Sequence, residues 1–249
     1  MNISHPLLIT MPQSHYAEKA RWAMDRVFDE YVEEPHVPGL HRLATLLYGG
    51  GSVPVMVHGE VRCTSSREIL SYCDWQLGGG GLYPSDAEAD AAVRALEELF
   101  DCRLGPASRV WAYQQTMQDA VIMTKLLTLG TPLRERMFWR VGGSTMTRLI
   151  ARGLAVSPEN AVQALDIITV IFEEVGRLLS DGRMYLQADQ FTAADLTFAA
   201  LASPVLLPPG GPASYPVLDD TPERMRVVVE KLRSTIAGQH CMRMYAQER

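Results

Sequence analysis

Residues 52–69 read SVPVMVHGEVRCTSSREI and contain the clearest structural signals in the chain. Two apolar, strand-like runs at 53–57 and 61–63 are joined at residues 58–60, where glycine supplies the positive φ of a tight hairpin. Three hydroxyl residues at 64–66 follow, and any of them is able to cap the helix that the next apolar positions indicate. The stretch therefore predicts an antiparallel hairpin followed directly by a helix.

The residues before this stretch alternate between strand and helix patterns. Residues 7–10 form a short apolar run, and apolar residues at helical spacing follow from 17 to 28. We expect a second short strand at 31–34 and a short helix at 40–47, which three glycines end. Together with the hairpin and the helix after it, these elements give the order β-α-β-α-β-β-α.

Four consecutive glycines at 78–81 interrupt this pattern, and beyond them the apolar spacing is helical. Each glycine costs a helix about 1 kcal/mol relative to alanine, so the four mark a linker between domains. We therefore predict an α/β domain over residues 1–80 and an all-helical domain over residues 84–249.

The second half contains several start and stop signals for helices. A capping box, Ser85-x-x-Glu88, opens an amphipathic run that reaches Leu129. Proline must kink or break this run at Gly105-Pro106, so one bent helix and two consecutive helices fit equally well. Two further helices are expected at 133–151 and from the Ser157-Pro158 start to residues 181–182. Another two are expected at 192–206 and at 222–237, the last with Thr221 as its cap and Gly238 as its end. Residues 208–216 between them read as a surface connection.

The composition is that of an ordinary folded protein. Apolar residues account for 47% and charged residues for 21% of the 249 residues, close to the average of soluble globular proteins. The formal net charge is −6 without a long run of Lys or Arg, so we expect no nucleic-acid partner. The longest apolar runs, such as 198–207, fall short of the roughly 20 residues of a spanning helix, so no membrane partner is expected.

The cysteines, the histidines and the first residues indicate a reducing compartment and no metal. Four cysteines lie far apart, which favours reduced, buried thiols over disulfides or zinc. They are Cys63, Cys73, Cys102 and Cys241. The histidines show no metal-binding spacing, and carboxylate pairs such as Glu97-Glu98 are most simply solvated charges. Residues 1–6 lack the basic start and apolar stretch of a secretory signal, so a cytoplasmic location is expected.

Three separated segments resemble the cytosolic glutathione transferase family and together span almost the whole chain. Residues 14–22, SHYAEKARW, are similar to the opening of the family's first helix, with a hydroxyl at the start and basic residues five and seven positions later. Residues 52–72 are similar to its Val-Pro-Val strand and the Ser-x-x-Ile helix start that follows. Residues 191–196, FTAADL, resemble its buried capping box, in which Thr192 and Asp195 cap each other's free amides.

The resemblance implies a thioredoxin-like N-terminal domain, an all-α C-terminal helical bundle and a serine-type glutathione site. Ser14 takes the catalytic position, and the family's cis proline turns the Val53 backbone outward to pair with the peptide part of glutathione. The implied glutathione-binding residues are Val53, Pro54, Ser65, Ser66 and Arg67. The resemblance also implies glutathione as co-substrate and a small hydrophobic electrophile as second substrate. It implies a homodimer and no metal.

Several of these positions have an alternative interpretation. Where the chain has Ser65, the family commonly has an acid that helps to hold the amino group of glutathione. Arg67 either reaches a ligand carboxylate or forms a surface ion pair. Four residues around the first helix and the Gly105-Pro106 bend either line an apolar second-substrate pocket or pack between helices. They are Tyr16, Trp111, Tyr113 and Met117.

Catalysis in the implied family means converting the glutathione thiol into a thiolate, to which the Ser14 hydroxyl donates a hydrogen bond. Such a bond is worth about 1.5–3 kcal/mol, so a thiol pKa near 8.5 falls by roughly one to two units. The expected reaction is transfer of an alkyl or aryl group to glutathione in detoxification, and a lyase, isomerase or dehalogenase reaction uses the same thiolate. The alternative is a non-catalytic ligand-binding or protein-interaction module, which Ser65 favours.

Overall fold

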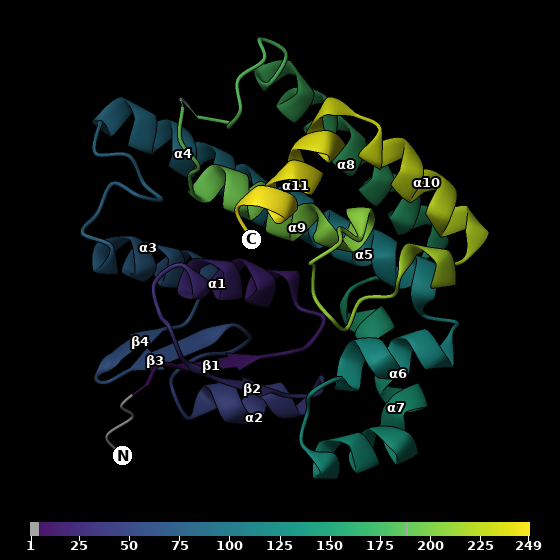
Figure 1. Cartoon of the computed structure of the whole chain (residues 1–249). Coiled ribbons are helices and arrows are strands. Elements are labelled where there is room, and N and C mark those ends of the chain that lie inside the picture. The colour runs from purple at the N-terminus through teal and green to yellow at the C-terminus, as the bar shows by residue number, and fades with distance from the viewer. Residues whose placement is uncertain (1–4, 188) are drawn as a thin grey trace.

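The N-terminal part of the chain is a four-stranded sheet with helices on both faces (Figure 1). The structure is a computed structural model that describes residues 5–187 and 189–249, so residues 1–4, where the predicted first domain begins, lie outside it. Its elements are β1 (Leu7–Thr10), α1 (His15–Asp25), β2 (Val32–Pro35), α2 (Leu40–Leu46), β3 (Val55–His58), β4 (Val61–Cys63) and α3 (Ser66–Gln76). The strand order is β2-β1-β3-β4, with only β1 and β2 parallel among these pairs. The predicted thioredoxin-like order is confirmed.

Alternation along β1 and β3 gives the sheet two apolar faces, because successive side chains of a strand point to opposite sides. Leu8 and Met56 belong to the large core cluster that also contains residues of α1 and α3. The neighbours of Leu8 and Met56 in the sequence point to the other face of the sheet and form a second cluster, which packs against side chains near α2. This second cluster consists of Leu7, Ile9, Val55 and Val57, packed by Ala44, Tyr48 and Val53.

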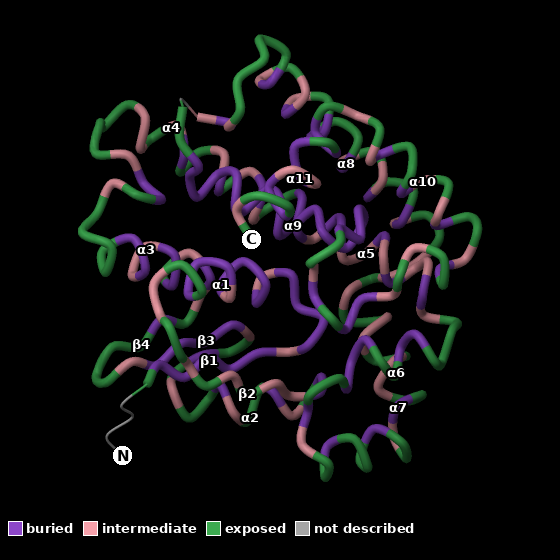
Figure 2. The backbone as a smooth tube through the Cα atoms, viewed as in Figure 1, coloured by how far each residue is buried: buried purple, intermediate pink, exposed green. Residues whose placement is uncertain are grey.

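The rest of the described chain is helical and surrounds one buried helix. The elements are α4 (Ala87–Leu99), a π-helix η1 (Phe100–Leu104), α5 (Gly105–Thr116), α6 (Ala120–Thr128), α7 (Leu133–Gly153), α8 (Pro158–Leu178), α9 (Ala193–Leu206), a 3-10 helix η2 (Leu218–Asp220), α10 (Glu223–Arg233) and α11 (Ile236–Gln247). Every residue of α9 is buried, as the purple tube in Figure 2 shows. The predicted Thr192–Asp195 capping box opens this helix.

The long run after the glycine linker differs from the prediction at both ends. Asp86, and not Ser85, caps α4, because its carboxylate accepts hydrogen bonds from the amides of Glu88 and Ala89. Helix α4 continues through η1 into α5, so the chain stays helical at Pro106. The run then stops at Thr116, and Asp119 caps a separate α6.

The C-terminal helix signal was also misplaced. The predicted helix at 222–237 is two helices, and Thr235 caps the second by accepting a hydrogen bond from the Gly238 amide. Gly238 therefore lies inside α11 instead of ending a helix. An added Cβ at Gly238 would collide with the Leu232 carbonyl oxygen, so glycine is needed for the close approach of the two helices.

The two parts of the chain share one hydrophobic core. The chain leaves α3 at Gln76 and enters α4 at Ala87, and the predicted boundary falls in this connection. Asp74 holds the connection by accepting hydrogen bonds from the amides of Leu82 and Tyr83. Helix α1 packs against both α3 and α9, so the first turn of α1 lies where the two parts meet.

Candidate functional site

Ser14 is the N-cap of α1 and belongs to the wall of a large cavity. Its Oγ accepts a hydrogen bond from the Ala17 amide at 3.2 Å, and its own amide donates to the Met11 carbonyl at 3.0 Å. The residue is 8% exposed and lines the cavity. A hydroxyl has one proton and two lone pairs, so accepting the capping bond leaves the Ser14 proton available to an acceptor in the cavity.

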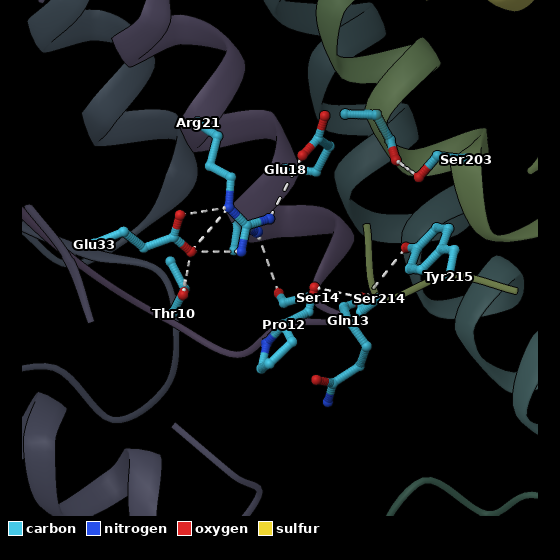
Figure 3. A network of polar contacts seen from close by, with 12 residues as sticks. Thr10, Pro12, Gln13, Ser14, Glu18, Arg21, Glu33, Ser203, Ser214 and Tyr215 are labelled. Carbon is cyan, nitrogen blue, oxygen red and sulfur yellow. Dashed lines mark hydrogen bonds and ion pairs between the residues drawn. The ribbon is translucent and has the colours of Figure 1, made fainter. Parts of the chain in front are cut away.

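The loop before Ser14 is held by a distant segment of the helical part. Ser214 Oγ donates to the Pro12 carbonyl at 2.9 Å, and the Tyr215 hydroxyl donates to the Gln13 carbonyl at 3.3 Å (Figure 3). Both side chains are buried. The stretch 208–216, which composition indicated as a surface connection, therefore fixes the backbone that presents Ser14.

His15 and Tyr16 fasten the first turn of α1 to the π-helix and α5. His15 Nε2 lies 2.9 Å from the Gly105 carbonyl oxygen, and the Tyr16 hydroxyl donates to the Asp101 carbonyl at 2.6 Å. In η1 the Gly105 amide bonds to Phe100 instead of Asp101, and Pro106 has no N–H, so the Asp101 carbonyl needs an outside donor. Tyr16 supplies that donor.

Neither of these two residues is set up to accept a proton from a neighbour. Burial, helped by the nearby Arg109 charge, lowers the pKa of His15 to about 3, so the ring is neutral at physiological pH. Burial and the Asp101 carboxylate raise the pKa of Tyr16 well above its usual value, so its hydroxyl stays protonated. The cap hydroxyl of Ser14 is thus the cavity-lining donor in this turn whose proton has no assigned partner.

A small cleft of about 420 Å³ brings together the residues of the Val-Pro and Ser-Ser motifs. The Val53–Pro54 peptide is cis, as expected from the sequence, and Val53 precedes the paired part of β3, which begins at Val55. Ser65 caps α3 through a 3.2 Å bond from the Glu68 amide to its Oγ. Ser66 begins α3, where helix amides lack partners within the helix and favour anions.

Residues of α4 and η1, two of them acidic, also line the small cleft. Glu98, Asp101 and Cys102 line it. Arg67 also lines the cleft, but its guanidinium forms ion pairs with Glu98 and Asp101, which corresponds to the ion-pair alternative considered for this residue. Two carboxylates therefore line the same cleft as Ser65, although the sequence carries no acid at position 65 itself.

Glu97 is not the solvated charge that its sequence context indicated. It is fully buried, and its Oε1 accepts a hydrogen bond at 2.8 Å from Lys19, which is also fully buried. Lys19 donates further to both oxygens of Asp101 at 2.9 Å, and the Tyr83 hydroxyl donates to Glu97 at 3.0 Å. The prediction was wrong because α1 packs closely enough for the lysine to reach across to α4 and η1.

The large cavity has a volume of about 830 Å³ and adjoins the small cleft, because Tyr16 and Val53 line both. Tyr113 lines its α5 wall and accepts a 3.3 Å hydrogen bond from Gln13 Nε2. Trp111 and Met117 are absent from the described lining of both cavities. The pocket prediction for these two residues is corrected: Trp111 is 2% exposed within the core cluster and Met117 packs against that cluster.

Helix α7 forms a wall of the large cavity that sequence reasoning missed. Its Glu135 is buried and accepts a 2.9 Å hydrogen bond from the Val37 amide, with its second oxygen 2.8 Å from His36 Nδ1. These contacts join α7 to the loop before α2 (Figure 1). Met146 lies so close to Gly39 that an added Cβ there would be 3.1 Å from its Cε. The helix was predicted, but its place over the cavity depends on contacts about one hundred residues apart.

The described residues offer no group of three or more side chains that could hold a metal ion. Within the described residues no single helix is long and apolar enough to cross a membrane. Helices α7 and α8 reach that length and apolar character only when they are counted together, and the chain bends between them. All four cysteines are free thiols, three of them buried, whereas Cys102 is exposed. The expected burial holds for Cys63, Cys73 and Cys241 and is wrong for Cys102, which is exposed on η1.

Comparisons with known proteins show what the chain is similar to. Residues 8–80 match the family model for the glutathione S-transferase N-terminal domain. A search of curated proteins found no match. Three solved structures with similar folds are a glutathione S-transferase-I bound with lactoylglutathione, the beta-etherase LigF from Sphingobium sp. strain SYK-6, and FzlA from C. crescentus.

These three structures are each 16% identical to the chain, with TM-scores of 0.57, 0.59 and 0.58 in that order. The alignments cover 96%, 96% and 98% of this chain, and 99%, 98% and 93% of the other chains. At such identity the likeness concerns the fold. Residues 8–80 therefore match a glutathione S-transferase N-terminal domain, and the chain as a whole has a fold similar to that of the glutathione S-transferases.

Proposed function

We propose that the protein is a glutathione transferase in which Ser14 stabilises the thiolate of glutathione for attack on a small, largely apolar electrophile. The observation that carries the proposal is the position of Ser14: its hydroxyl accepts the capping bond, keeps its own proton to donate, and lines the large cavity, which adjoins the small cleft. Glutathione in the small cleft and an electrophile in the large cavity would then meet beside this hydroxyl.

The small cleft supports the binding of a tripeptide. The Val53 main chain lies beside the cis bond, outside the paired strand, and offers partners to a peptide backbone. The first amides of α3, near Ser66, favour a carboxylate. Glu98 and Asp101 supply negative charge for an amino group, a role that the family commonly gives to an acid at the position of Ser65.

The hydroxyl and the start of α1 act on the thiol in the same direction. A hydrogen bond to a charged sulfur is worth about 1.5–3 kcal/mol, and a helix N-terminus adds about 0.3–1 kcal/mol in favour of an anion. Since one pKa unit equals about 1.4 kcal/mol, the two effects together lower a thiol pKa near 8.5 by about one to three units. Much of the bound thiol is then ionised at neutral pH.

A non-catalytic ligand-binding module is the second candidate. The pairing of Arg67 with Glu98 and Asp101 favours it, because the guanidinium then contributes less to a ligand carboxylate. We also propose a homodimer in the cytoplasm, where a reduced pool of glutathione suits a chain with four free thiols.

The test compares Ser14→Ala with Ser157→Ala in calorimetry with glutathione and in kinetics with a panel of electrophiles. Ser157 Oγ caps α8 by accepting from the Asn160 amide at 3.1 Å, so its loss is a matched cap deletion away from the cavities. We expect Ser14→Ala to lower kcat/KM at neutral pH by about 10- to 100-fold and to raise the pH at which the bound thiol ionises. Ser157→Ala should leave both unchanged.

Two results would contradict this assignment in different ways. Full activity of Ser14→Ala would remove the catalytic role of the hydroxyl. Absence of glutathione binding by the wild-type protein at millimolar concentration would instead leave the ligand-binding or interaction module as the function.

A further inference from the structure

The large cavity is positively charged within an acidic protein. Its described lining contains Arg42 and Arg109 but no Asp or Glu, although the chain as a whole has a formal net charge of −6. The other basic side chains around α1 have acidic partners: Lys19 pairs with Glu97, and Arg21 pairs with Glu33. The charge imbalance is therefore local to the cavity.

Arg109 is the more informative of the two cations. Arg42 is exposed, whereas Arg109 is partly buried on α5, and its Nε is buried without a hydrogen-bond partner. None of the ion pairs among the described residues includes Arg109. The terminal nitrogens of its guanidinium also have no acceptor among the hydrogen bonds of the described residues, and Arg109 lines the cavity, so these nitrogens are free to donate to an acidic group there.

Tyr113 lies one helical turn after Arg109 and lines the same cavity. Its oxygen accepts from Gln13, and no acceptor for its own proton is among the hydrogen bonds of the described residues. Burial raises its pKa, so the hydroxyl remains a donor at physiological pH. A guanidinium and a hydroxyl at this spacing suit the two oxygens of one carboxylate.

The remaining wall of the cavity is mostly apolar. Side chains of α6 and α7 and the segment after them supply Leu126, Met146, Leu149, Ile150 and Leu154. An occupant that satisfies both walls has an apolar body and one acidic group.

We infer that the second substrate of the proposed glutathione reaction is an apolar organic acid, whose anionic group is bound by Arg109 and Tyr113. The inference rests on the proposed function only for the transfer of the acid to glutathione. Binding of the acid does not depend on it, because Arg109 and Tyr113 lie on α5 and are not part of the small cleft. Binding of the acid is therefore testable without glutathione.

The experiment measures the affinity of the full-length protein for naphthylacetate and for naphthylacetamide, which have nearly the same shape and differ in charge. We expect the wild-type protein to bind the acid about tenfold or more tightly than the amide. Arg109→Met should remove most of this preference while amide binding changes little, and Arg109→Lys should keep part of it. Arg103→Met, which deletes an exposed arginine of η1, is the matched control and should bind like the wild type.

Three outcomes would overturn the inference. The first is a wild-type protein without preference for the acid, and the second is an equal loss of acid and amide binding in Arg109→Met with thermal unfolding unchanged. The third is a loss of glutathione affinity in Arg109→Met as large as the loss for the acid, since Arg109 would then serve the peptide. If the acid preference holds but no thiol transfer is detected, the proposed enzyme activity fails and the acid site stands.

Discussion

Replacing Lys19 by methionine should be among the most destabilising single changes in this protein. The lysine is completely buried and neutralises Glu97, which is also completely buried, and Asp101, whose side chain is 14% exposed. Methionine fills a similar volume without charge, so the change leaves carboxylates without their cation and creates only a small packing defect. Breaking a buried ion pair by removing one partner typically costs about 3–5 kcal/mol.

The size of the chain converts this cost into a change in melting temperature. For 150–250 residues, each kcal/mol shifts Tm by about 2–4 °C, so Lys19→Met should lower Tm by about 6–20 °C. Urea denaturation followed by circular dichroism measures the free energy directly. Arg94→Met is the control, because Arg94 pairs with Asp90 on the exposed side of α4, where such pairs contribute about 1 kcal/mol or less.

Adding Glu97→Gln to Lys19→Met tests the cause. The glutamine removes the uncompensated buried charge, so the double variant should be more stable than the sum of the two single effects predicts, by about 1–3 kcal/mol. Asp101 still faces Arg67 at 3.5 Å in that variant. Additive effects, or a Lys19→Met cost no larger than that of Arg94→Met, would refute the reasoning.

Three further predictions follow from buried or capped groups. The pKa of His15 falls from 6.5 to about 3 on folding, so the unfolded chain binds more protons than the folded chain between these pH values. The free energy of unfolding, measured by urea denaturation, should therefore fall as pH drops through that range, by up to about 1.4 kcal/mol per pH unit. His15→Asn should show a smaller fall, and an equal fall would contradict the role of His15. The hydrogen bond from Cys102 to Glu98 raises the pKa of this exposed thiol, so iodoacetamide should label it slowly at neutral pH. Glu98→Gln should speed up the labelling, which mass spectrometry measures. An unchanged labelling rate would contradict the effect of Glu98 on the thiol. Asp195→Ala removes the acceptor of three buried donors, the Leu186 amide and the amide and hydroxyl of Thr192, and should lower the free energy of unfolding by at least about 3 kcal/mol. Asp119→Ala removes an exposed helix cap and should lower it by about 1 kcal/mol. Equal losses in denaturation experiments would show that burial adds nothing to the cost.

Features that depend on residues close together in sequence were predictable. The hairpin at 52–69, the Ser157 cap and the Thr192–Asp195 capping box involve partners at most a few residues apart, so their chemistry is visible in a short stretch. Even there, neighbouring hydroxyl and carboxyl residues compete, and Asp86 caps α4 where Ser85 was expected.

The positions of the site residues were only partly predictable. The motif at Val53 and the one at Ser14 indicated that the two residues belong to one site, and both line the large cavity. Nothing in the local pattern separates Tyr113, which lines the cavity, from Trp111, which is buried two residues earlier. Successive residues of a helix point in different directions, and only the packing of α5 against its neighbours decides which direction meets the cavity.

The sequence by itself determined the order of strands and helices in the first 80 residues and the caps at Ser157 and Thr192, because these follow from backbone preferences over a few residues. The tertiary structure alone decided which charges are paired: it buries Glu97 against Lys19, leaves the adjacent Glu98 at the cleft, and keeps Arg109 in the large cavity without a carboxylate. The physical reason is that the energy of a charge depends on its solvent exposure and on partners brought close from distant parts of the chain.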